Sequence, residues 1–211
     1  MPGIVHVVDD DASYLSAIQQ LLEASGYRVA TYASAQQLLD RQPDDSKGCI
    51  LLDVRMPGID GLELQSRLTE RGSKLPIIFL TAYPDVSITV KAIKAGADDF
   101  LIKPVGSEDL LSAISRAITR HRNVRALDGE LEALRSRLST LTSRQRQVFE
   151  IIVQGKTNKL AARELGSTER TVKAHRSAIM DKLQVQSVVD LVRIAERLGV
   201  LGDKDGPDAA G

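Results

Sequence analysis

Four apolar runs in the first half of the chain each end beside a side chain that could bind a cation or a phosphate. The runs predict buried strands, and in open α/β sheets ligands bind beyond the carboxyl ends of the strands. We therefore expect these side chains to meet at one edge of a sheet. In chain order they are Asp9 with Asp10, Asp53, Thr81 and Lys103.

These residue types together fit phosphoryl chemistry. Three carboxylates at one edge repel each other unless a cation lies among them, and oxygen ligands with open positions suit Mg²⁺, which also bridges to phosphate. A carboxylate such as Asp53 can act as a nucleophile and form an aspartyl-phosphate. Mg²⁺ and Lys103 would neutralise the arriving charge, and the Thr81 hydroxyl would donate a hydrogen bond. Each residue alone has an ordinary structural explanation, so the prediction rests on the set.

Alternating strands and helices must position these side chains. Amphipathic stretches separate the apolar runs, and Gly26 and Gly96 are predicted to stop two of the helices. Five such strands, apolar throughout, predict a doubly wound five-stranded parallel sheet, an α/β fold. The predicted strands are Ile4–Val8, Tyr27–Tyr32, Cys49–Asp53, Pro76–Leu80 and Asp98–Ile102.

A longer helical pattern follows the last strand. From Leu110 to Leu141 mostly apolar residues recur at alternating steps of four and three, the spacing of a coiled-coil seam. His121 and Gly129 interrupt this pattern. We expect one long helix that leaves the first domain and carries a seam for a second copy into residues 120–140. The alternative is a helix that packs back on its own domain.

The last part of the chain predicts a small all-α domain. Thr142 and Gln145 have the spacing of a capping box, and Gly155 and Gly166 separate short helical patterns. Short helices with glycine in the turn are typical of a helix-turn-helix. The tail, residues 202–211, is small, polar and rich in glycine, and is predicted to be disordered. The predicted helices cover residues 143–154, 158–165, 169–183 and 188–198.

The charge of the chain differs between its two parts. Residues 1–119 hold 11 Lys and Arg against 16 Asp and Glu, whereas residues 140–201 hold 11 against 6. A basic domain favours nucleic acid as a partner. Cys49 is the one cysteine of the chain, which fits a reducing cytosol, and no apolar run approaches the roughly 18 residues of a membrane span. No secretory signal is visible, so we expect a cytoplasmic protein with no membrane contact.

Residues 3–119 resemble the receiver domain of two-component response regulators, which are CheY-like. The matching segments are V-V-D-D-D at 7–11, L-L-D-V-R-M-P-G at 51–58, L-T-A at 80–82 and K-P at 103–104. The resemblance implies that a sensor histidine kinase phosphorylates Asp53. Asp10 would bind Mg²⁺ directly with Asp9 assisting, and the backbone carbonyl of Arg55 would be a further ligand.

The same resemblance assigns the remaining residues of the receiver site. It implies that Thr81 and Lys103 contact the phosphoryl group, and that Phe100 is an aromatic switch that turns inward when Thr81 moves. It also implies that the peptide bond between Lys103 and Pro104 is cis, a form that is uncommon elsewhere.

Residues 141–198 resemble a LuxR-type helix-turn-helix, the output domain of the NarL/FixJ subfamily. The matching segments are L-T-x-R-Q-R-x-V at 141–148, G-K-T-N-K at 155–159, T-V-K-x-H at 171–175 and K-L-x-V-x-S at 182–187. The sequence departs from the pattern at Gln145, where glutamate is usual, and at Val188, where arginine is common. The departure at Val188 puts any role of that arginine in doubt here.

The second resemblance implies that the helix from Thr171 to Leu183 enters the major groove of DNA, which admits one α-helix. Base edges would be addressed by Lys173, Ala174 and Ser177, with Arg176 reaching a base or a phosphate. Phosphate contacts, which position rather than specify, are expected from Asn158, Lys159, Thr171 and His175.

The sequence therefore predicts a non-enzymatic, phosphorylation-dependent transcription regulator that binds double-stranded promoter DNA as a homodimer. Its expected parts are a receiver over 1–119, a helical linker over 120–140, a DNA-binding domain over 141–201 and the tail. Two alternatives stay open: a phosphate-independent regulator with a vestigial pocket, and an enzyme that turns over an aspartyl-phosphate.

Overall fold

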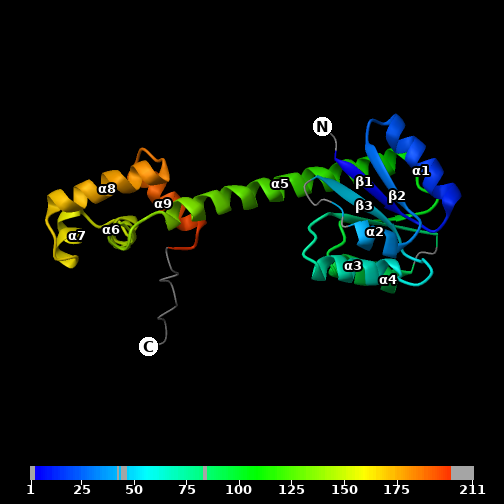
Figure 1. Cartoon of the computed structure of the whole chain (residues 1–211), viewed down its shortest axis with the longest axis horizontal. Helices are drawn as coiled ribbons and strands as arrows, with labels where there is room; N and C mark the ends of the chain where they lie inside the picture. The colour runs from blue at the N-terminus through cyan, green and yellow to red at the C-terminus, as the bar shows by residue number, and fades with distance from the viewer. Residues whose placement is uncertain (1–2, 42, 44–46, 83–84, 201–211) are drawn as a thin grey trace, which may run out of the picture. The chain divides into compact units, whose positions relative to one another are not determined.

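The computed structural model describes residues 3–41, 43, 47–82 and 85–200 of the 211-residue chain. The chain divides into two compact units, with the boundary between Arg125 and Ala126 (Figure 1). This boundary falls inside the segment predicted as a linker. The predicted disordered tail lies outside the described residues.

The first unit is built on a parallel sheet, as predicted. Its described strands lie in the order β2-β1-β3-β4-β5, and all neighbouring pairs are parallel. Each strand begins and ends within one residue of the predicted range, because each apolar run is bounded by polar or small residues. The strands are β1 (Ile4–Val8), β2 (Arg28–Tyr32), β3 (Gly48–Asp53), β4 (Ile77–Thr81) and β5 (Asp99–Ile102).

Helices cover both faces of this sheet (Figure 1). On one face α1 (Ala12–Ala24) and the first part of α5 (Ser107–Ser139) bury one apolar core. On the other face α2 (Ala35–Arg41), α3 (Gly61–Glu70) and α4 (Val86–Lys94) bury a second. The central strands β1, β3 and β4 are therefore buried between two helical layers, which explains their mostly apolar sequences, whereas the edge strands β2 and β5 are partly exposed.

Local signals in the sequence set where these helices begin and end. The Asp11 carboxylate caps α1 by accepting hydrogen bonds from the backbone N–H groups of Ser13 at 2.8 Å and Tyr14 at 3.2 Å. Gly26 and Gly96 follow the ends of α1 and α4 with φ of 85° and 95°, so both predicted stops are confirmed.

Gly61, the first residue of α3, lies directly against the end of β3. A Cβ atom at this position would lie 2.3 Å from the backbone oxygen of Asp53 and 3.0 Å from the ring of Phe79. The Gly61 N–H also donates to the Val54 carbonyl at 3.0 Å. A side chain at position 61 would therefore displace the backbone that carries Asp53.

Helix α5 is continuous from Ser107 to Ser139, but the prediction of a free seam along it is wrong for both ends. Leu110, Ile114 and Ala117 are buried in the core of the first unit. The alternative, a helix that packs back on its own domain, fits this first part of α5, whereas Leu134 and Leu138 pack against the core of the second unit, which neither prediction included. Heptad spacing predicts an apolar stripe on a helix, but it does not determine which residues pack against that stripe. Here the two cores of the same chain cover most of it.

The second unit is an all-α domain, as predicted. Its buried core draws side chains from every helix, including Phe149, Ala161, Val172 and Leu191. The predicted capping box at Thr142 and Gln145 is present. The helices lie within one residue of the predicted ranges: α6 (Ser143–Val153), α7 (Asn158–Glu164), α8 (Glu169–Leu183) and α9 (Val188–Arg197).

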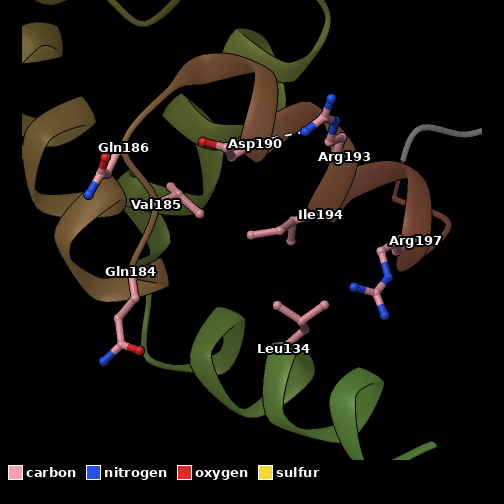
Figure 2. A pocket seen from close by; sticks show the side chains of 8 residues that line it. All are labelled: Leu134, Gln184, Val185, Gln186, Asp190, Arg193, Ile194 and Arg197. Atoms are coloured by element: carbon pink, nitrogen blue, oxygen red, sulfur yellow. Dashed lines mark ion pairs between the residues drawn. The ribbon is translucent and has the colours of Figure 1, made fainter. Parts of the chain in front are cut away.

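The end of α5 belongs to this second unit and lies beside α9. Leu134 points toward Ile194 across a surface hollow of about 450 Å³ (Figure 2). The Arg197 guanidinium donates to the Glu130 carboxylate at 2.8 Å. Exposed ion pairs stabilise little, so the apolar contacts of Leu134 and Leu138 contribute most of the stability of this packing.

No helix within the described ranges is both long and apolar enough to cross a lipid bilayer.

Candidate functional site

The carboxyl ends of β1, β3 and β4 form a pocket of about 170 Å³. Val8 pairs with Leu52 and Asp53 pairs with Leu80, so the residues that follow these strands lie at one edge of the sheet. The structure thus brings together the predicted receiver residues other than Phe100. The pocket is lined by Asp9, Asp10, Asp11, Asp53, Arg55, Thr81, Ala82 and Lys103.

The Lys103 ammonium lies between two buried carboxylates. It donates to Asp53 Oδ1 at 2.7 Å and also donates to Asp9 Oδ2. Burial raises the pKa of the Asp9 carboxyl, and the hydrogen bond from Lys103 opposes this rise. Burial by itself lowers the pKa of Lys103, but its hydrogen bonds to Asp53 and Asp9 outweigh burial, and the pKa is raised. The pocket therefore favours the cationic form of Lys103.

Asp53 has both carboxylate oxygens engaged. Besides the bond from Lys103 to Oδ1, the backbone N–H of Arg55 donates to Oδ2 at 2.7 Å. The residue is 7 % exposed, and its neighbour Val54 is bonded through its N–H to the Leu80 carbonyl at 3.1 Å. The carboxylate is thus fixed in orientation while one side remains open to the pocket.

The donor set suits Mg²⁺, because Asp9, Asp10 and Asp53 supply hard oxygen ligands beside the Arg55 backbone. Within the described ranges, however, no group of three or more acidic, histidine or cysteine side chains is already gathered for a metal ion. In this structure the Lys103 ammonium forms ion pairs with both Asp9 and Asp53.

Thr81 and Phe100 lie on the β4–β5 side of the site. Thr81 is buried at the end of β4, and its backbone carbonyl accepts from the Lys103 N–H at 2.7 Å. Phe100 is half-buried outside the pocket, with its ring 6.0 Å from the ring of Phe79. The peptide bond between Lys103 and Pro104 is cis, as the resemblance implies.

Sequence reasoning missed Tyr14, whose ring centroid lies 4.1 Å from the Lys103 ammonium. A tyrosine on an amphipathic helix is by default part of the core, and Tyr14 does pack against the core beneath α1. No signal in the sequence placed its ring beside the site.

In the second unit α7 and α8 form a helix-turn-helix. Lys173, Ala174 and Ser177 are exposed on one face of α8, and Val172 lies in the core behind them. Arg170, which the sequence reasoning did not include, is exposed one turn earlier on the same face. Arg170 lies three residues before Lys173 and four before Ala174, a spacing that places all three on one helix face. This spacing could have identified Arg170 as a further candidate DNA contact.

Several predicted DNA contacts already have partners within the domain. Arg176 is half-buried and donates to the Asn158 side chain at 3.3 Å, which links α8 to α7. The Thr171 hydroxyl lies 2.8 Å from that of Thr168, the residue that caps α8. Lys159 is exposed and His175 is half-buried.

Gln145, which departs from the family pattern, is buried and has a structural role. Its side-chain oxygen accepts from the Thr142 N–H at 3.1 Å and from the Lys182 ammonium at 2.8 Å. Arg144 beside it donates to the Leu165 carbonyl at 2.5 Å, at the end of α7. Together these bonds join α6 to both helices of the helix-turn-helix without a charged residue at 145.

Two families match the two units. Residues 5–115 match the response regulator receiver domain, and residues 139–195 match the bacterial regulatory proteins of the luxR family. The chain therefore belongs to the two-component response regulators with a LuxR-type DNA-binding domain, and the subfamily of NarL and FixJ fits it. Such a protein is a phosphorylation-dependent regulator of transcription.

Individual relatives cover nearly the whole chain. It is 42 % identical to the response regulator protein TmoT of Ectopseudomonas mendocina, over 93 % of this chain and 89 % of that protein. It is 39 % identical to the transcriptional regulatory protein FixJ of Bradyrhizobium diazoefficiens, over 95 % of this chain and 98 % of FixJ. Among solved structures, the response regulator StyR has a TM-score of 0.86 at 39 % identity, covering 93 % of this chain and 100 % of that one.

Proposed function

We propose that a sensor histidine kinase phosphorylates Asp53, and that this modification controls the binding of promoter DNA by α8. The observation that carries the proposal is the buried, doubly hydrogen-bonded Asp53 carboxylate that faces Lys103 at the mouth of the pocket. This arrangement holds a nucleophile in one orientation beside a cation that can neutralise an arriving phosphoryl group.

The phosphoryl transfer follows from these contacts. An Asp53 carboxylate oxygen attacks phosphorus, the bond from phosphorus to the donor's nitrogen breaks, and the nitrogen keeps the electron pair. Lys103 shifts its hydrogen bonds from the free carboxylate to the phosphoryl oxygens, and the Thr81 hydroxyl donates to another. In-line transfers of this kind depend mainly on positioning and charge neutralisation.

Mg²⁺ is the cofactor that the donor set favours. Asp9, Asp10, Asp53 and the backbone carbonyl of Arg55 would hold it, and it would neutralise phosphate charge that Lys103 alone does not. Asp10 is exposed at the edge of the pocket and is not bonded to Lys103, which leaves its carboxylate available for this role.

The signal passes from the pocket to the surface through Thr81 and Phe100. When the Thr81 hydroxyl moves toward the phosphoryl group, the space that it leaves allows Phe100 to turn inward from β5. Residues of α4 and β5 then change their exposure. Phosphorylation would thus act by shifting the equilibrium between two conformations of Thr81, Phe100 and the surface over α4 and β5.

The surface over α4 and β5 is the one that we propose pairs two copies. Val86, Val90 and Ile93 follow one stripe of α4 and are exposed, and Ile102 is exposed on the edge strand β5. Exposed apolar side chains on neighbouring elements such as α4 and β5 favour an interaction surface. The seam of α5 retains only Val124 and Leu127 as large exposed residues among those described, because its ends are covered.

Light scattering tests this proposal, with Mg²⁺ and beryllium fluoride standing in for the phosphoryl group. We expect a monomer that becomes a dimer only when both are added, and no change for Asp53→Ala. Val90→Asp should block the dimer, whereas Val124→Asp, at a valine of similar exposure (49 % against 45 %), should not. Loss of the dimer in Val124→Asp alone would instead assign it to the seam of α5.

The exposed face of α8 is proposed to read base edges in the major groove through Lys173, Ala174 and Ser177. Arg176 and Asn158 support the orientation of α8 through their mutual hydrogen bond and reach toward the backbone. Lys159, Thr171 and His175 are proposed to contact phosphates, which fix position without reading sequence.

Lys173→Ala is expected to weaken binding to a cognate operator by roughly 1–3 kcal/mol while leaving binding to unrelated DNA nearly unchanged. Lys159→Ala is the matched control, because loss of a phosphate contact should weaken both kinds of binding alike. Fluorescence anisotropy with both DNAs at fixed salt measures the difference. Equal losses for Lys173→Ala would reassign Lys173 to the backbone.

Further features complete the proposed role. Burial raises the pKa of the Cys49 thiol, so the cysteine is a core residue and not a reactive one, in keeping with a cytoplasmic protein.

The chain is proposed to act as a regulator rather than as an enzyme with released products. Its proposed parts remain a receiver at 1–119, a linker at 120–140 and a DNA-binding domain at 141–201.

A further inference from the structure

We propose that Tyr14 is a positioning residue of the phosphoryl site, because its aromatic ring holds the Lys103 ammonium in place. The inference rests on the proposed phosphorylation of Asp53 and adds a residue that the family motifs do not contain. Its first support is geometric: the ammonium lies 4.1 Å from the ring centroid, well within the roughly 6 Å range of a cation–π contact.

The hydroxyl of Tyr14 does not explain why a tyrosine lies here. Its oxygen is buried and has no hydrogen-bond partner in the part of the chain that the structure describes. Burial raises the pKa of this hydroxyl, so it stays protonated. A buried donor without a partner is destabilising. The useful part of the side chain is therefore the ring, which packs on the core of α1 and contacts Lys103.

The position of the ring is linked to that of the acidic residues. Tyr14 lies in the first turn of α1, and its N–H donates to the Asp11 carboxylate at 3.2 Å. The Asp11 N–H in turn donates to Asp9 Oδ1 at 3.0 Å. One short segment thus carries Asp9, one of the two carboxylates that flank Lys103, together with the Tyr14 ring.

The ring contact is suited to a cation that must change its hydrogen-bond partners. Lys103 has three N–H donors on a flexible stem, and in this structure it donates to Asp9 and Asp53. Binding of a phosphoryl group redirects these donors, but attraction to a ring face uses no particular N–H. Tyr14 can therefore restrain Lys103 before and after the transfer, which reduces the entropy lost when Lys103 binds phosphoryl oxygens.

Affinity of the full-length chain for beryllium fluoride in the presence of Mg²⁺, followed by fluorine NMR, tests the inference. Tyr14→Phe should stay within about two-fold of wild type, because the ring is kept. Tyr14→Leu should bind about three- to thirty-fold more weakly, the range that corresponds to loss of a cation–π contact. Tyr27→Leu is the matched control, since Tyr27 packs in the same core but precedes β2 at the opposite edge of the sheet.

A series of fluorinated phenylalanines at position 14 separates the ring's charge distribution from its shape. Successive fluorines weaken the negative face of the ring with little change in size, so affinity should fall stepwise with their number. Equal affinity across the series, or a Tyr14→Leu protein that binds as wild type does, would overturn the inference while the proposed function stands. Failure of the wild-type protein to bind beryllium fluoride would overturn both.

Discussion

Replacing Asp53 with asparagine is expected to reduce phosphorylation by a small-molecule phosphodonor to background while the protein stays folded. The amide is nearly the same size but is not a nucleophile, so no bond to phosphorus can form. It also replaces one of two acceptor oxygens with an NH₂ group, which would face either Lys103 or the Arg55 N–H, both donors. We expect local rearrangement and an unchanged far-ultraviolet circular dichroism spectrum.

Labelling with a radioactive donor, followed by peptide mapping, measures this effect. Asp40→Asn is the matched control, because Asp40 is an exposed carboxylate on α2 and its loss should leave labelling at the wild-type level. If Asp53→Asn still gave a labelled peptide that contains residue 10, the acceptor would have to be assigned to Asp10 instead.

The second large effect is expected from Lys103→Met, measured as the free energy of unfolding of the first unit. Methionine keeps the length of the side chain but leaves Asp9, 1 % exposed, and Asp53 as two neighbouring buried carboxylates without a countercharge. Loss of one member of a buried charge cluster is destabilising. We therefore expect the free energy of unfolding to fall by about 2–4 kcal/mol in the presence of a chelator.

Mg²⁺ should restore part of that lost stability. The cation can take the position between the carboxylates that Lys103 occupies in the wild type, so Mg²⁺ should stabilise the variant more than the wild type. Urea unfolding at increasing MgCl₂ concentrations tests this, with Lys91→Met, at an exposed lysine of α4, as the control. Equal stabilisation of Lys103→Met and wild type by Mg²⁺ would show that metal and ammonium do not share a position.

The parts of the fold that could be predicted are those in which residue type alone sets the local geometry. Apolar runs bounded by polar residues located the strands, and the carboxylates that end them located the pocket. Helix α2 carried no comparable signal, because it is only seven residues long. Its buried side chains include Leu38 and Leu39, which in sequence resemble any short apolar pair.

What could not be predicted depends on contacts between segments far apart in the chain. The stripe on α5 has coiled-coil spacing whether its partner is a second copy or the chain's own cores. The structure places Leu110 in one core and packs the partly buried Leu134 against the other. Similarly, the spacing of Arg176 on α8 indicates a basic surface, but its hydrogen bond to Asn158 exists only because α7 packs beside α8. The contact of Tyr14 with Lys103 is of the same kind.

The close packing of Gly61 against β3 has a consequence for the direction in which the signal can leave the pocket. On that side the start of α3 packs closely on β3, since even a Cβ atom at position 61 would lie 2.3 Å from the backbone oxygen of Asp53. By contrast, Ala92 is the only buried residue of α4 among those that the structure describes, and β5 is partly exposed along its length. Any displacement is therefore expected to spread toward α4 and β5, and Gly61→Ala should disturb the acceptor directly, through the backbone of Asp53.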